Sequence, residues 1–126
     1  SMTLRTKDTI SRVVSADDEK DSDAAVYRRG FEFEKLIPKL DFPEGTELIV
    51  PESVVGDVCA LKVISDTWVL LRVYRTNGDL IAEFFIEEKC NAAIELDAVN
   101  AIVTDRCGRV IIFDYQERIL RANLRF

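Results

Sequence analysis

Two mainly apolar runs, residues 68–75 and 80–87, flank a short polar segment in the middle of the chain. Runs of this length that are rich in β-branched and aromatic residues and are bounded by turn residues are typical of β-strands. The joining segment contains Asn77-Gly78, and an Asn-Gly pair favours a type I′ turn because both residues adopt positive φ angles readily. Such a turn fixes the pairing of the strands. The predicted pairs are Val73 with Ala82, Leu71 with Phe84, Val69 with Ile86, Tyr74 with Ile81, Arg72 with Glu83, and Leu70 with Phe85.

The two faces of this predicted hairpin differ. One face is entirely apolar and is expected to be core, whereas the other places the Arg72–Glu83 pair, worth roughly a few tenths of a kcal/mol, among large apolar side chains. A mixed face of this kind is normally covered by another element or by a partner. Because aromatic anchors often dominate binding energy, we expect partner-binding residues there. They are Trp68, Leu70, Tyr74, Ile81 and Phe85, with Lys89 in the polar turn that follows. The alternative is that the C-terminal segment covers this face as core.

The last segment of the chain, residues 114–126, fits two patterns. Asp114 and Glu117 have the spacing of a helical cap, and good helix formers follow them. Residues 120–126 also alternate between apolar and polar types, as a strand does. We favour the helix. Short apolar runs bounded by turn residues precede it at 46–50, 59–64, 92–96, 99–104 and 109–113. The predicted fold class is therefore α+β, a six-stranded antiparallel β-sheet packed against a C-terminal α-helix.

Composition divides the chain into three parts. Residues 1–23 are polar, end in an acidic run, and are expected to form a flexible leader. Residues 24–56 contain turn-forming Pro and Gly residues and are interpreted as an N-terminal extension with a short helix and strands. Residues 57–126 hold the predicted sheet and helix and form the main domain.

The composition disfavours several classes of function. The 126 residues include 17 Lys and Arg against 23 Asp and Glu, a net charge of −6, whereas nucleic-acid binders usually have a basic surplus. No apolar run has membrane-spanning length, so no membrane contact is expected. The chain has no His, and its three Cys lack metal-ligand spacing. We therefore expect no metal, no cofactor and no enzymatic activity, and we interpret the Cys residues as reduced thiols of an intracellular protein.

The order of motifs along residues 67–126 resembles a polo box, the module found in pairs at the C-terminus of Polo-like kinases. The segments that carry the resemblance are Arg75-Thr-Asn-Gly-Asp79, Phe84-Phe85, Glu87-Glu-Lys89, Ala93-Ile-Glu-Leu96, Ala101-Ile-Val-Thr-Asp105 and Arg109-Val-Ile-Ile-Phe113. The resemblance implies six strands followed by a long helix. Phosphopeptide binding in the family needs a His-x-Lys pair and a Trp on the first strand. This chain has Glu87-Glu88-Lys89 and places Trp68 on the second strand, so phosphopeptide recognition is not expected.

A divergent polo box of this kind is similar to the targeting modules of centriole-duplication kinases and of kinetoplastid kinetochore kinases, which homodimerise or bind partner proteins. The resemblance therefore implies a non-catalytic module for protein–protein interaction that localises or scaffolds a larger cell-division protein. The expected sites are the nucleus and kinetochore or the centriole and basal body. The expected partner is a protein, either a second copy of the chain or a different one.

The alternative is a structural fragment of a β-propeller, or of a similar repeat sheet, that acts as a scaffold. Residues 105–114 have the Asp…Gly-Arg-Val…Phe-Asp appearance of part of a propeller blade. Such a repeat requires a second copy at a regular interval, and residues 76–87 show only a faint one. A helix at 114–126 would favour the polo box, whereas a strand would favour the blade.

Overall fold

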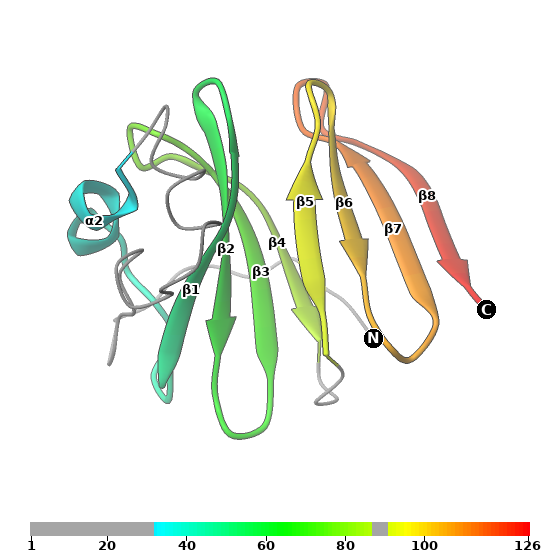
Figure 1. The fold of residues 1–126 in the computed structure, drawn as a ribbon, viewed down its shortest axis with the longest axis horizontal. Helices are drawn as coiled ribbons and strands as arrows, with labels where there is room; N and C mark the ends of the chain where they lie inside the picture. Colours follow the sequence, from blue (N-terminus) through cyan, green and yellow to red (C-terminus); the bar gives the residue numbers. More distant parts are fainter. Residues whose placement is uncertain (1–31, 87–90) are drawn as a thin grey trace.

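The computed structural model describes residues 32–86 and 91–126, and this part of the chain is almost entirely β-structure. Its strands form two four-stranded antiparallel sheets in which neighbours in sequence are neighbours in space (Figure 1). The first sheet contains β1 (Leu48–Val55), β2 (Val58–Ile64), β3 (Val69–Arg75) and β4 (Leu80–Ile86). The second sheet contains β5 (Ala93–Leu96), β6 (Asn100–Thr104), β7 (Arg109–Asp114) and β8 (Ile119–Arg125). A short helix, α2 (Phe33–Leu36), continues into the 3-10 turn η2 (Ile37–Lys39).

The predicted α+β fold, a six-stranded sheet on a C-terminal helix, is wrong, because the C-terminal segment forms strand β8. The predicted cap does form: Asp114 accepts hydrogen bonds from the amides of Gln116 and Glu117 at 3.0 and 2.9 Å. The turn ends at once at Arg118, whose φ of 59° is incompatible with a helix. The chain then pairs with β7 along its open edge, so the strand alternation prevails over helix propensity.

The predicted pairing of β3 with β4 is confirmed over most of its length, from Val69 with Ile86 to Val73 with Ala82. The type I′ turn is wrong, because Gly78 has a φ of 105° but Asn77 has no positive φ. The Gly78 amide instead donates to the Arg75 carbonyl at 2.9 Å. An extra residue then enters β4 as a β-bulge. Tyr74 consequently pairs with Leu80 and not with Ile81.

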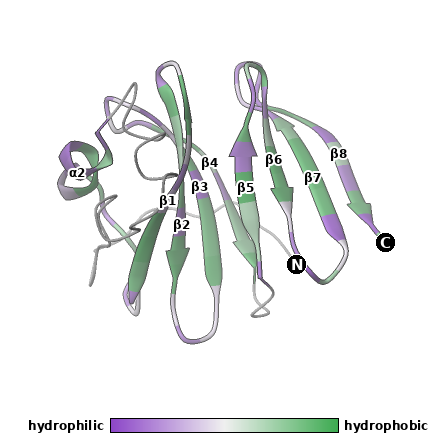
Figure 2. Ribbon diagram, in the orientation of Figure 1, coloured by the Kyte–Doolittle hydropathy of each residue, from purple (hydrophilic) through white to green (hydrophobic). Residues whose placement is uncertain are grey.

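The main hydrophobic core lies between the two sheets. The first sheet contributes β3 and β4 side chains such as Leu71 and Phe84, and the second contributes β6 and β7 side chains such as Val103 and Phe113. The rings of Phe84 and Phe113 meet edge to face with centroids 5.6 Å apart. Figure 2 shows that the strands on both sides of this core are largely hydrophobic. The sheets are thus held together chiefly by apolar burial.

Residues 33–42, which we call the cover, lie on the opposite face of the first sheet. Phe33, Leu36, Ile37 and Leu40 have the i, i+3, i+4, i+7 spacing of one helical face, and all four are buried against this sheet. The layers therefore run from the cover through the first sheet to the second sheet, with α2 and β8 at opposite ends (Figure 1). The expected domain boundary between residues 56 and 57 falls within the β1–β2 hairpin.

Candidate interaction surface

The predicted partner-binding residues lie mostly beneath the cover. Leu70 and Tyr74 are fully buried, and Trp68 and Phe85 are half-buried against the same hydrophobic cluster. Ile81, displaced by the bulge in β4, joins the core between the sheets instead. Lys89 lies outside the described residues. The mixed hairpin face is therefore core, but the element that covers it is the N-terminal segment and not the expected C-terminal helix.

The Arg72–Glu83 ion pair is part of this buried layer. Both side chains have an exposed fraction of 0%, and Arg72 Nε donates to a Glu83 carboxylate oxygen. Arg72 Nη1 also donates to the carbonyl of Asp41 at 2.8 Å and to the hydroxyl of Tyr74 at 3.0 Å. The guanidinium lies over the ring of Phe42, 5.3 Å from its centroid. The surface-pair energy expected from the sequence is wrong for this site, because the pair is buried and ties the cover to the sheet.

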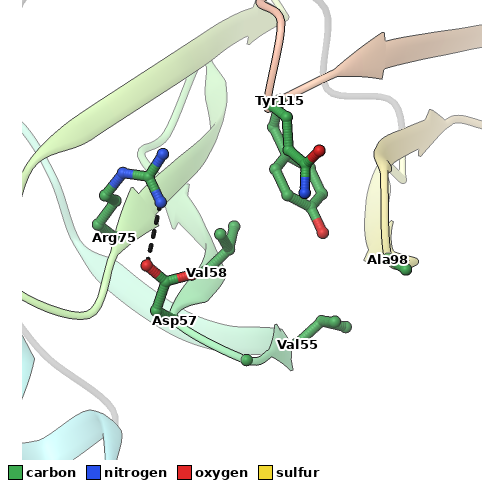
Figure 3. A pocket seen from close by; sticks show the side chains of 8 residues that line it. Val55, Asp57, Val58, Arg75, Ala98 and Tyr115 are labelled. Atoms are coloured by element: carbon green, nitrogen blue, oxygen red, sulfur yellow. Dashed lines mark hydrogen bonds and ion pairs between the residues drawn. The ribbon is translucent and has the colours of Figure 1, made fainter.

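A cavity of about 380 Å³ opens where the β1–β2, β5–β6 and β7–β8 turns converge (Figure 3). Asp57 and Arg75 form an ion pair of 3.0 Å at one side. At the other side, the Tyr115 hydroxyl donates to the carbonyl of Asp97 at 2.5 Å. Burial, and then the nearby carboxylates of Asp97 and Asp57, raise the pKa of Tyr115 above its ordinary value. Because its charged groups are paired and Tyr115 stays protonated, the described lining offers no nucleophile with a base beside it.

The two cysteines that the structure describes, Cys59 and Cys107, give no sign of a reactive or metal site. Burial raises the pKa of the Cys59 thiol to about 12, so this free cysteine is inert at neutral pH. Cys107 is disulfide-bonded, so the expectation of a reduced thiol is wrong at that position. Cys90 lies outside the described residues. Within 32–86 and 91–126, no group of three His, Cys, Asp or Glu residues is arranged to hold a metal ion.

The apolar surface that the described residues do expose gathers on β8. This strand is the last in the second sheet, so one of its edges is unpaired. Its large exposed side chains are Ile119 at 44%, Leu120 at 52% and Leu124 at 49%, followed by Phe126 at 85%. The sequence of residues 120–126 shows the apolar and polar alternation of this strand, but the helix was favoured for this segment, so its exposed apolar side chains were not predicted. An edge strand with exposed apolar side chains is a site where another chain can bind.

The strands and turns of the second sheet correspond to those of the first, and this correspondence shows which face of the second sheet is equivalent to the covered face of the first. The β2–β3 turn closes with the Ser65 amide donating to the Trp68 carbonyl, and the β6–β7 turn closes with the Asp105 amide donating to the Arg109 carbonyl. Val69 and Val110 are the first residues that pair across the strands after these turns, so they lie on corresponding faces of the two sheets. Val69 faces the second sheet in the main core, whereas Val110, by strand alternation with the core residue Ile111, faces away from it.

Strands β4 and β8 repeat in the same way. Leu80-Ile81-Ala82 and Leu120-Arg121-Ala122 lie 40 residues apart, and each places its middle residue in a β-bulge. Beyond the bulge, Phe84 is equivalent to Leu124, and Ile86 to Phe126. Phe84 and Ile86 are 7% and 0% exposed because the second sheet covers them, whereas Leu124 and Phe126 are 49% and 85% exposed. On the second sheet, the face that corresponds to the covered face of the first therefore leaves its large β8 side chains exposed.

We call this surface the open face. Its central members pair across β6, β7 and β8: Ile102 with Ile112, Ile112 with Ala122, and Val110 with Leu124. Phe126 continues the alternation beyond Leu124, where its amide donates to the Gly108 carbonyl at 2.7 Å. The open face is therefore an apolar sheet face of the kind that, on the first sheet, is buried by another sheet. Sequence alone could not place it, since few identical residues mark the repeat.

In the part of the chain that the structure describes, no helix is long and apolar enough to span a membrane. No protein-family model matches the chain. No curated protein and no solved structure gives a significant match either. The comparisons therefore identify no polo box and assign the chain to no family.

Proposed function

We propose that this chain is a non-catalytic module for protein–protein interaction whose binding surface is the open face. The proposal keeps the interaction role expected from the sequence but moves it from the buried hairpin face to the outer side of β6, β7 and β8. It is also the scaffold role that a repeat of stacked sheets would have.

One observation supports the proposal most directly. Phe84 and Ile86 are buried by a neighbouring sheet, and the residues equivalent to them, Leu124 and Phe126, are exposed. Burying large apolar side chains of a continuous sheet face lowers the free energy by about 25 cal/mol per Å² of apolar surface removed from water. A partner that covers this face would gain that energy without reorganising the sheet.

The cell-division role implied by the polo-box resemblance is a narrower proposal. Targeting to a kinetochore or centriole depends on which protein binds, and the geometry of the open face favours an apolar partner surface without naming it. The described residues of this face do not form a cluster of cationic side chains that could bind a phosphate. The surface therefore favours a partner that is not phosphorylated.

A pair of leucines on β8 allows a matched test. Leu124 belongs to the open face, whereas Leu120 lies on the other side of the strand with a similar exposed fraction, 49% against 52%. Partners of the full chain would be isolated from cells of its source with the wild type, Leu124→Arg and Leu120→Arg, identified by mass spectrometry, and reconstituted from purified protein. We expect binding to survive in Leu120→Arg and to be lost in Leu124→Arg.

Two results would contradict the proposal. A reconstituted partner that binds Leu124→Arg as tightly as wild type would place the interaction elsewhere. Equal loss in both variants would indicate a general effect of adding charge to β8. Circular dichroism of each variant establishes that the sheets are folded before binding is compared.

A further inference from the structure

We infer that the open face binds the open face of a second copy of this chain, forming a symmetric dimer of four stacked sheets. The inference rests on the proposed interaction role of this face and names its partner. It starts from the stacking already present, in which the second sheet covers the apolar face of the first. The open face is equivalent to that covered face, so a further sheet is the surface that fits it best.

The chain itself restricts which sheet this can be. A copy could stack head to tail only by presenting the far side of its first sheet, where Leu70 and Tyr74 are fully buried by the cover. The cover is fixed by the hydrogen bond from Arg72 to the Asp41 carbonyl and by its own apolar side chains. The remaining sheet face that a second copy offers among the described residues is its own open face.

Pairing two open faces produces a closed assembly. Each copy contributes a cover, a first sheet and a second sheet, so the order becomes cover, two sheets, two sheets, cover. An isologous contact of this kind is the commonest arrangement in homo-oligomers and leaves no repeated surface from which a fibre could grow. Both ends of the stack are then shielded, as terminal capping units shield other repeat proteins.

The charges around the open face are compatible with this contact. Its centre, formed by Ile102, Val110 and Ile112, carries no charge, so no like charges are forced together. Glu95 lies toward the β5 side of the same face. Arg121 lies on β8 at the other side, where it is half exposed and is paired with Asp114 and Glu117 of its own chain. A two-fold axis parallel to the strands sets the β5 side of one copy against the β8 side of the other, which brings Glu95 toward the Arg121 of its partner.

The test is the solution mass of the full chain. Sedimentation velocity from micromolar to millimolar protein would compare the wild type, Leu124→Arg and the matched control Leu120→Arg. We expect dimers for the wild type and Leu120→Arg, and a folded monomer for Leu124→Arg. Because the two-fold axis places two Leu124 side chains in each dimer, its dissociation constant should rise roughly a hundredfold or more.

A second variant keeps the test informative if Leu124→Arg does not fold. Phe126 is 85% exposed within one chain, so Phe126→Asp should fold normally and still weaken the dimer. A wild type that stays monomeric throughout the range overturns the inference, and so does a dimer that both Leu124→Arg and Phe126→Asp leave intact. A monomer whose reconstituted partner binding still depends on Leu124 would overturn the dimer but leave the proposed interaction role standing.

Discussion

Removing one partner of the buried Arg72–Glu83 pair should destabilise the fold far more than removing both. Both side chains are fully buried, so Arg72→Met removes the cation that is paired with the buried Glu83 carboxylate, a change that typically costs about 3–5 kcal/mol. The same substitution removes the hydrogen bonds to Asp41 and Tyr74, worth about 1 kcal/mol each. The double variant Arg72→Met/Glu83→Leu removes both charges and should recover most of the loss.

Equilibrium unfolding in denaturant measures this cycle, with circular dichroism for the sheets and the fluorescence of Trp68, which packs beneath the cover. The control is Arg75→Met, which breaks the exposed 3.0 Å pair with Asp57 three residues along the same strand. The control should cost about 1 kcal/mol or less. Losses of that same size for Arg72→Met and Glu83→Leu alone, or simple additivity in the double variant, would refute the reasoning.

The remaining predictions concern two turn glycines, the capping residue Asp114 and the buried thiol of Cys59. Gly108 has a φ of 86°, and a Cβ there would lie 2.6 Å from the Phe126 carbonyl oxygen, so Gly108→Ala should cost about 2 kcal/mol or more. Gly45→Ala, with a φ of 90° but open space around it, should cost about 1 kcal/mol in the same thermal unfolding assay. Hydrogen bonds from the Glu117 amide and from Arg121 lower the pKa of Asp114 below its ordinary value of 3.8. The ionised carboxylate therefore stabilises the fold at pH values above 3.8, and this stabilisation is lost as the pH falls through the lowered pKa. Acid unfolding should therefore be shallower in Asp114→Asn, and parallel curves would contradict this. Burial raises the pKa of the Cys59 thiol to about 12, so at pH 8 it should react with a thiol reagent only as fast as the protein unfolds. Rapid labelling of the folded protein would contradict this and would show that the cover opens readily.

The sequence determined the central hairpin well because its information is local. Two mainly apolar runs on either side of Asn77-Gly78 leave few alternative pairings, and the pairs from Val69 to Val73 are as predicted. The turn type was not determined, because Asn-Gly also suits a turn in which only the glycine is left-handed. That one difference introduced the bulge, shifted Tyr74 to Leu80, and moved Ile81 into the other core.

The C-terminal strand and the candidate surface depend on contacts distant in sequence. Asp114 caps a single turn in the structure as it would cap a helix, so its pattern could not distinguish the two. The free edge of β7 decided the outcome. The cover left a visible signal in the spacing of Phe33, Leu36, Ile37 and Leu40, which indicates a helix with one apolar face to bury. The open face left almost none, since Leu-x-Ala is the main identity shared by β4 and β8.

Strands β3 and β8 differ strongly in how far their backbone amides are protected from hydrogen exchange. β3 is paired on both edges and buried on both faces, so exchange of its amide hydrogens requires the cover and both neighbouring strands to separate. β8 has one free edge and mostly exposed side chains, so its amides exchange through a local opening of much lower free energy. Amide exchange should therefore be slowest at β3 and fastest at β8, and binding of any chain along β8 would be recorded first as slower exchange in that strand.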